Sequence, residues 1–183
     1  MTSYQVHACM VGRRMRDSSI HRLHTDPGTL IPMAYYFWVL RSEDEFIPVD
    51  TGFPLESATS RNAELTGYRS PRELLDDLGV DRTGVRRVIL THLHWDHCAQ
   101  LDLFPNAVFF VQRREMAFVT GPFAGHPALR PFVDTEAVLH LVRLNQEGRV
   151  VVLDGERRLD EGLDLVLAGG HAPGSQMVRV RSE

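Results

Sequence analysis

The feature that most constrains this chain is a dense run of three histidines and one aspartate, Thr-His-Leu-His-Trp-Asp-His. It directly follows residues 85–90, a short apolar run that predicts a buried strand. Because side chains two residues apart share a face of an extended chain, we expect His92, His94 and Asp96 to converge. His97 is expected to point elsewhere as the backbone turns. Binding residues often follow the end of a strand, so the fold should bring this loop to the edge of a sheet.

The composition of this run indicates metal binding. Imidazole nitrogens and carboxylate oxygens are the ligands that zinc, iron and manganese sites use. The alternative is a solvated polar loop or a set of hydrogen-bonded histidines. At the His and Asp frequencies of this chain, such a pattern would arise by chance in roughly one chain in a thousand. The density of ligand-type side chains therefore favours a metal site.

A further histidine lies in a glycine-rich turn much later in the chain. His171 follows Gly169 and Gly170 and precedes Ala-Pro-Gly, a composition typical of a tight turn at a strand end. A lone histidine of this kind is usually structural. Beside a His-x-His pair, however, His171 would supply the third donor that a zinc site needs.

The remainder of the sequence alternates apolar runs with turn residues and indicates a mixed α and β fold. The predicted strands are 35–40, 46–50, 85–90, 107–111, 150–153, 163–168 and 177–181, the first two forming a hairpin. The predicted helices are 71–78, 113–119 and 135–144. Ser70 and Glu73 have the spacing of a capping box, with Pro71 at the first helical position, and Asp134 is suited to cap the last helix. The segments 51–70 and 120–131 are expected to be loops.

Length and composition place all 183 residues in a single globular domain, residues 1–183. With 43% apolar residues the chain is not of a disordered class. The net charge is −4 and the basic residues are scattered, so we expect neither nucleic acid nor membrane as a partner. Small molecules are the expected ligands, and the sequence leaves the oligomeric state open.

The N-terminus and the cysteines favour a cytoplasmic location. Met1–Asp17 contains no continuous apolar segment of the kind found in signal peptides. No apolar run approaches the ~18 residues needed to cross a membrane. Cys9 and Cys98 are far apart and suggest neither a disulfide framework nor a cysteine zinc site. We expect Cys98 to be a small buried residue, although its place beside His97 would also let it tune a metal site.

Three motifs in order along the chain resemble the metallo-β-lactamase superfamily of metal-dependent hydrolases. These motifs are Val49-Asp50-Thr51-Gly52, His92-x-His94-x-Asp96-His97 and Gly170-His171-Ala172-Pro173-Gly174. The N-terminal segment Gly12-Arg13-Arg14-Met15 with Asp17-Ser18-Ser19 further resembles the N-acyl homoserine lactonase branch. The resemblance extends from about Val11 to Arg181 and suggests that His21 and His24 lie near the mouth of the pocket.

The resemblance implies an α/β (α+β) fold, an αββα sandwich of two sheets flanked by helices, with a two-metal site at one edge. It implies that His92, His94 and His171 bind the first metal and that Asp96 and His97 bind the second. It makes Asp50 a residue that braces the metal loop by hydrogen bonding. The expected cofactor is zinc, two ions per complete site, with manganese, iron or cobalt as alternatives.

The activity that the resemblance implies is hydrolysis of a lactone ring by a metal-activated hydroxide. N-acyl homoserine lactone, a bacterial signalling molecule, is the expected substrate. Asp96 is the expected catalytic residue, because a carboxylate at that position could carry a proton to the leaving group.

The sequence departs from the family pattern after His171. Family members carry there a metal-bridging aspartate, a final histidine and, in the lactonases, a tyrosine, whereas no Asp, His or Tyr follows His171 in this chain. We therefore expect a chain truncated at its C-terminus, with the second half of the sandwich incomplete and apolar strand faces exposed. Our hypothesis is that it holds one metal well and the second weakly, with poor or absent activity.

Two other functions stay open at this point. The same fold and motif serve hydrolases of other esters, thioesters and lactams, because they do not set the substrate. A catalytically silent metal-binding domain is also compatible with the missing ligands. The sequence contains no G-x-S-x-G elbow, P-loop or dinucleotide fingerprint to support a serine hydrolase, a nucleotide-binding protein or a dehydrogenase.

Overall fold

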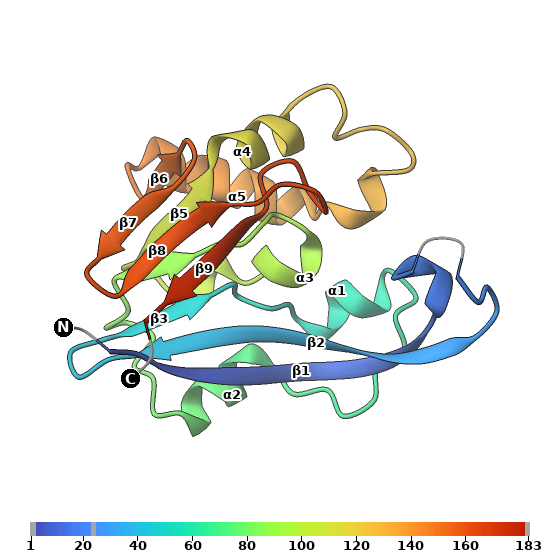
Figure 1. Ribbon diagram of the computed structural model, residues 1–183, viewed down its shortest axis with the longest axis horizontal. Coiled ribbons are helices and arrows are strands. Elements are labelled where there is room, and N and C mark those ends of the chain that lie inside the picture. The colour runs from blue at the N-terminus through green and yellow to red at the C-terminus, as the bar shows by residue number, and fades with distance from the viewer. Residues whose placement is uncertain (1–2, 23–24, 182–183) are drawn as a thin grey trace.

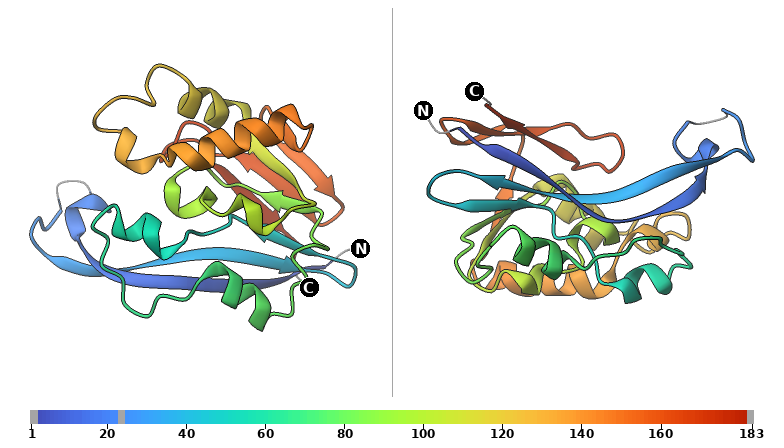
Figure 2. Two further views of the ribbon diagram at one scale, coloured as in Figure 1. Left: turned by 180° about the vertical axis from the view of Figure 1, so that it is seen from behind. Right: turned by 90° about the horizontal axis from the view of Figure 1, so that it is seen from below.

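The computed structural model describes residues 3–22 and 25–181 and arranges them in three layers (Figures 1 and 2). A six-stranded sheet in the order β1-β2-β3-β4-β5-β6 forms the middle layer. A three-stranded sheet, β7-β8-β9, covers one of its faces, and the helices lie against the other. The fold is therefore the mixed α/β, two-sheet arrangement that the sequence predicts.

The elements have the following bounds. The strands of the larger sheet are β1 (Gln5–Asp17), β2 (Leu30–Arg41), β3 (Phe46–Val49), β4 (Arg87–Ile89), β5 (Val108–Gln112) and β6 (Val150–Leu153). Those of the smaller sheet are β7 (Arg157–Asp160), β8 (Leu163–Leu167) and β9 (Gln176–Val180). The helices are α1 (Leu55–Thr59), α2 (Pro71–Asp77), α3 (Trp95–Cys98), α4 (Arg113–Thr120) and α5 (Thr135–Gln146). Short 3₁₀ turns occur at Ser18–Ile20, Leu101–Leu103 and Arg130–Phe132.

The strand pairing of the larger sheet changes from antiparallel to parallel at β3. Strands β1, β2 and β3 pair antiparallel, whereas β3, β4, β5 and β6 pair parallel. The carboxyl ends of β3, β4 and β5 therefore reach the same edge of the sheet, and the histidine-rich loop follows β4 at that edge. Strands β1 and β2 extend as a long hairpin beyond the rest of the sheet (Figure 1). A register shift between Met10 and Gly12 interrupts their pairing.

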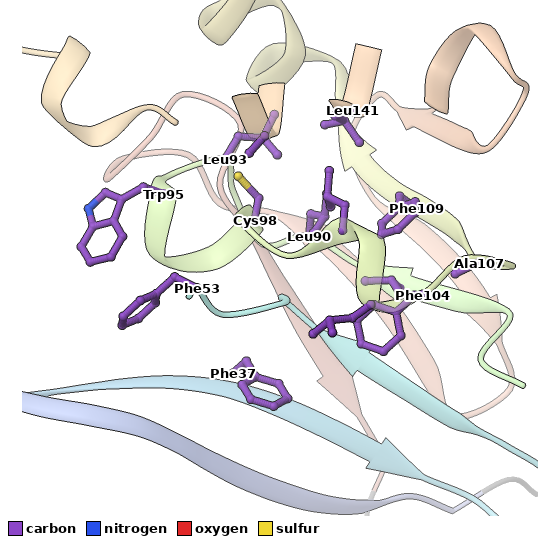
Figure 3. Packing of buried hydrophobic residues seen from close by; sticks show 14 of the residues in the cluster. Phe37, Phe53, Leu90, Leu93, Trp95, Cys98, Phe104, Ala107, Phe109 and Leu141 are labelled. Carbon is purple, nitrogen blue, oxygen red and sulfur yellow. The ribbon is translucent and has the colours of Figure 1, made fainter. Parts of the chain in front are cut away.

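The main core lies between the larger sheet and the helices. It includes Phe37 from β2, Phe109 from β5 and Leu141 from α5, all fully or nearly fully buried. Figure 3 shows Leu93 and Cys98, which come from the histidine-rich loop and α3, within this same cluster. The loop that carries the histidines is thus anchored by apolar side chains on its inner side.

A second core joins the two sheets. Leu163 and Leu165 of β8 pack against residues that include Leu40 of β2 and Ile47 of β3. Two residues on the same face of β2 are not covered in this way: Tyr36 and Trp38 are 38% and 41% exposed, and their rings stack with centroids 5.9 Å apart. The exposed apolar strand face that the sequence led us to expect is therefore present on β2.

Local signals in the sequence placed several elements correctly. Ser70 and Glu73 form the predicted capping box at the start of α2, and Asp134 accepts a hydrogen bond from the Ala137 amide at the start of α5. The prediction of loop for 51–70 is wrong over α1, which starts after Pro54 without a side-chain cap and so leaves no sequence signal. Strands β1 and β7 were not predicted. In β1 the register shift and a mixed polar pattern obscure the alternation that marks a strand.

Within the part of the chain that the structure describes, no helix is long and apolar enough to cross a membrane.

Candidate metal centre

The histidine-rich loop leaves β4 extended and becomes helical at Trp95. His94 is the N-cap of α3, so Asp96 and His97 are helical residues. The prediction of an extended chain is therefore wrong beyond His94, and so is the expectation that His97 points elsewhere. Its ring lies 4.0 Å from that of His92, measured between centroids. The helical turn rotates His97 back toward the loop that precedes it.

Three histidines converge at the edge of the sheet. The potential ligand atoms of His92, His94 and His171 all lie within 4.8 Å of one another. Nε2 of His171, from the turn between β8 and β9, lies 3.0 Å from Nδ1 of His94 although the residues are 77 positions apart. We call His92, His94 and His171 the histidine triad. Two imidazole nitrogens at this separation can share one proton or one cation.

Hydrogen bonding leaves one nitrogen of His92 without a partner. Its Nδ1 lies 3.1 Å from the Thr91 hydroxyl, which itself lies 2.8 Å from Oδ2 of Asp50. If the Thr91 hydroxyl donates to this carboxylate, Nδ1 of His92 carries the proton and donates to Thr91. The lone pair is then on Nε2, which is buried and has no hydrogen-bond partner among the described residues. Such an orphaned buried nitrogen is unusual in a protein and is what a cation would satisfy.

Burial keeps two members of the triad, His92 and His94, neutral. Removal from water, together with the neighbouring imidazoles, lowers the pKa of His92 to about 2. Burial and the proximity of His171 lower the pKa of His94 to about 4. Neutral imidazole is the form that binds metals.

The other side of the centre is built differently. Nδ1 of His97 donates to Oδ2 of Asp50 at 2.7 Å, and its Nε2 lies 3.4 Å from Oδ2 of Asp96. We call Asp50, Asp96 and His97 the carboxylate group. Burial disfavours charge on His97, but the two carboxylates outweigh it and raise the pKa to about 10. Burial likewise opposes ionisation of Asp96, but the hydrogen bond and charge of His97 lower its pKa to about 2.

Asp50 connects this group to the loop. It is 2% exposed, and its carboxylate accepts the Thr91 amide at 2.7 Å in addition to the Thr91 hydroxyl and His97. The next residues bind α3 through the backbone: the Thr51 amide donates to the His97 carbonyl at 2.7 Å. Gly52 has a positive φ of 63°, and a Cβ there would lie 2.8 Å from Pro71. The turn after β3 is thus shaped to hold α3 closely.

Glu115 is a residue of the centre that sequence reasoning missed. This fully buried side chain on α4 accepts the Leu93 amide at 3.0 Å through one oxygen and the Gly174 amide at 2.9 Å through the other. It therefore joins the loop of His92 and His94 to the turn of His171. A Cβ at Gly174 would lie 2.3 Å from the Glu115 amide nitrogen, so only glycine permits this approach. In the sequence, a glutamate in the first turn of a helix looks like an ordinary surface residue.

Two buried glutamines reinforce the same junction. Nε2 of Gln176 donates to the Leu90 carbonyl at 2.8 Å, and its Oε1 accepts from Gln112 at 2.9 Å. The Gln176 backbone amide donates to the Thr91 carbonyl at 2.8 Å. The start of β9 is thereby bonded to the end of β4, which fixes the separation of the two histidine-bearing segments.

A cavity of about 850 Å³ opens beside the triad. Its inner wall contains His94, Asp96 and His171, and the rest comes from the β1–β2 hairpin, the end of α1 and the 3₁₀ turn at Arg130–Phe132. His21 lines it, as the resemblance suggested, whereas the expectation for His24 falls outside the described residues. His92 and His94 are buried but His171 is exposed, so the centre faces this cavity from its His171 side.

The residues present fit a divalent cation on the triad side. Three imidazoles converge there, and one of their nitrogens has no other partner in the described chain. The residues of the carboxylate group satisfy one another. Within residues 3–22 and 25–181, no other group of three ligand-type side chains has its potential ligand atoms all within 4.8 Å of one another.

Comparison with known proteins agrees with this geometry. The sequence profile of the Metallo-beta-lactamase superfamily matches residues 30–183. An N-acyl homoserine lactonase of Bacillus thuringiensis is 25% identical over 205 residues, an alignment that covers all of this chain and 72% of that protein. The N-acyl homoserine lactonase AttM of Azorhizobium caulinodans is 38% identical over 107 residues, covering 57% of this chain and 39% of its own length.

Solved structures agree as well. A crystal structure of a quorum-quenching N-acyl homoserine lactone lactonase superposes with a TM-score of 0.78 and 26% identity. The alignment covers the whole of this chain and 70% of the chain in that structure.

Proposed function

The chain belongs to the metallo-beta-lactamase superfamily and is a metallo-hydrolase, and we propose that it opens the lactone ring of N-acyl homoserine lactones. The observation that carries this proposal is the convergence of three imidazoles at the wall of a cavity large enough for a small acylated molecule. The similarity to N-acyl homoserine lactonases over the full length of this chain supports the choice of substrate. A cytoplasmic location, expected from two unpaired buried cysteines, belongs to the same proposal.

The residues that would hold a divalent cation are the triad, with Asp96 and His97 as ligands to a second ion. We propose zinc, because the triad offers three imidazole nitrogen donors; manganese, iron and cobalt accept the same donors. When bound, such a cation supplies Lewis-acid chemistry, polarising an ester carbonyl and lowering the pKa of a water molecule.

Asp96 is the residue that we assign to proton transfer. Its carboxylate lines the cavity, and the low pKa of this group keeps it ionised at neutral pH. In ring opening, the water oxygen bonds to the carbonyl carbon of the lactone, the bond between that carbon and the ring oxygen breaks, and the ring oxygen takes up a proton to become a hydroxyl group. Asp96 would receive the proton from water and deliver it to that ring oxygen.

Asp50, Glu115 and Thr91 would act through position. Asp50 orients His97 through Nδ1, Thr91 orients His92 through its hydroxyl, and Glu115 holds the His171 turn against the loop. Fixing donor atoms before binding reduces the reorganisation that binding and catalysis require.

The test measures hydrolysis of N-hexanoyl homoserine lactone by the zinc-loaded chain. The rate is recorded as proton release at constant pH. We expect slow ring opening by the wild type, none by His171→Ala, and the wild-type rate by His140→Ala, a control variant outside the centre. Faster turnover of an open-chain ester, thioester or lactam would replace the lactonase by another hydrolase of this fold. Zinc binding without hydrolysis of any of these would mean a catalytically silent metal-binding domain.

A further inference from the structure

Among the described residues, the charged side chains that line the cavity beside the triad are mainly positive. Four guanidinium groups line it, those of Arg14, Arg16, Arg61 and Arg130, whereas its acidic lining is Asp96 alone. Asp96 already faces His97 at 3.4 Å. A cavity for a neutral lactone with an apolar acyl arm needs none of these cations.

One of the four arginines has a structural role. Arg61 donates to the carbonyls of Ser57 and Val133, lies 3.6 Å from Asp134 and stacks over the Trp95 ring at 5.1 Å. It fixes the 3₁₀ turn against α1 and α3, so its guanidinium is already committed to protein contacts and is not assigned to ligand binding.

The other three arginines have no carboxylate partner among the residues that the structure describes. Within residues 3–22 and 25–181, Arg14, Arg16 and Arg130 take part in no ion pair. The adjacent acid, Asp17, is occupied by the amides of Ser19 and Gly28. Arg14 lies beside the phenol of Tyr35, where it opposes the rise that burial causes in the pKa of that group.

Arg16 has a buried donor without an acceptor. Its Nε is shielded from solvent and has no hydrogen-bond partner in the described chain. A buried N–H of a guanidinium without an acceptor is costly, and proteins seldom leave one unless a ligand, ion or water completes it. Arg14 and Arg16 alternate along β1 opposite Met33 and Ile31 of β2, so both point from the same face of the hairpin.

From these contacts we infer an oxyanion subsite formed by Arg14 and Arg16, with Arg130 at its rim, which binds an acidic group on the acyl arm of the substrate. The inference rests on the proposed function for the reaction but specifies a different part of the substrate. Met33, Tyr35 and Phe132 provide apolar surface in the lining of the same cavity. The substrate class is therefore an acyl lactone or ester whose arm ends in a carboxylate or a phosphate. The guanidinium fork is suited to either group.

Binding is tested without hydrolysis by calorimetry at low salt. The probes are adipamate, which carries a carboxylate at the end of a six-carbon arm, and hexanamide, its neutral counterpart. We expect adipamate to bind wild type at least about tenfold more tightly than hexanamide. Arg16→Gln and Arg14→Gln should each remove this preference. Arg13→Gln is the matched control, because Arg13 is exposed on the opposite face of the same strand and should leave the preference intact.

Equal affinity for the two probes, or an adipamate preference that survives in both Arg16→Gln and Arg14→Gln, would overturn the subsite. A preference that survives in both variants would mean that the carboxylate of adipamate binds at the triad instead. Loss in Arg13→Gln equal to that in Arg16→Gln would also overturn it, since general surface charge would then explain binding. Replacing adipamate by its phosphate-terminated analogue decides between the two oxyanions. The probe that binds more tightly identifies the acidic group at the end of the acyl arm.

Kinetics then separates the subsite from the reaction. For zinc-loaded enzyme, kcat/KM for N-adipoyl homoserine lactone should exceed that for N-hexanoyl homoserine lactone, and Arg16→Gln should reverse the order. Hydrolysis of neither lactone would contradict the proposed function, while the calorimetric result would still decide the subsite.

Discussion

The histidine triad and the carboxylate group lie side by side and use the same kinds of side chain, but they favour opposite protonation states. In the triad, burial outweighs the charge of Asp96 and lowers the pKa of His92 to about 2 and that of His94 to about 4. In the carboxylate group, Asp50 and Asp96 overcome burial and raise the pKa of His97 to about 10. His92 and His94 are therefore already in the neutral form that a cation requires. His97 must first release a proton, which makes a second ion harder to bind.

Removing a triad histidine should have the largest effect. We expect the wild type to hold about one zinc per chain and His92→Ala to hold none after dialysis, because the triad nitrogen that has no hydrogen-bond partner among the described residues is lost. Elemental analysis of metal per chain measures this. His140→Ala should keep its zinc. Two tightly bound ions in the wild type would contradict the difference between the two sides that the pKa values indicate.

Asp50→Asn is the corresponding test of the carboxylate group. The amide keeps the size of the side chain but removes the charge that holds the His97 proton, so the pKa of His97 should fall toward 6.5. The first zinc should remain. Affinity for a second should fall by about 10-fold or more, because Asp50 no longer orients the His97 ring. Titration of the imidazole resonances by NMR reports the pKa directly. Asp102→Asn, an exposed change beyond α3, is the control, and an unchanged His97 titration in Asp50→Asn would refute the assignment.

Glu115→Gln should disturb the link between the two segments that form the triad. Glutamine offers one acceptor oxygen where the carboxylate offers two, so either the Leu93 or the Gly174 amide is left unpaired. We expect a loss of about 1–3 kcal/mol in the free energy of unfolding, measured by urea denaturation. Weaker zinc binding should accompany it. Glu136→Gln, an exposed change in the first turn of α5, should alter neither quantity.

The stability of the metal-free chain should depend on pH in opposite directions for the two sides. His92 and His94 have lowered pKa values, so their contribution is complete above pH 6.5 and is lost as the pH falls toward 4. His97 has a raised pKa, so its contribution is complete below pH 6.5 and is lost as the pH rises toward 10. Denaturation across this range should show a maximum near pH 6.5. In Asp50→Asn the decline on the alkaline side should weaken, and an unaltered decline would assign it to other groups.

Several features were predictable because their causes are local. Ser70, Pro71 and Glu73 determine the start of α2 through contacts within four residues. The candidate ligands on the His92–His97 segment were also predictable, because these residues lie close together in the sequence itself. The orientation of His97 was not, since it depends on where the extended loop becomes helical.

The sequence by itself determined which side chains could bind a metal, and it indicated the fold through a short set of motifs. The tertiary structure decided which nitrogen of His92 is free, how Glu115 joins two distant segments and why neighbouring histidines differ in charge. It also decided that Arg14 and Arg16 face a cavity rather than solvent. The physical reason is that pKa values and unsatisfied donors depend on burial and on charges a few ångströms away. Chain folding brings those neighbours together from positions that are remote in sequence.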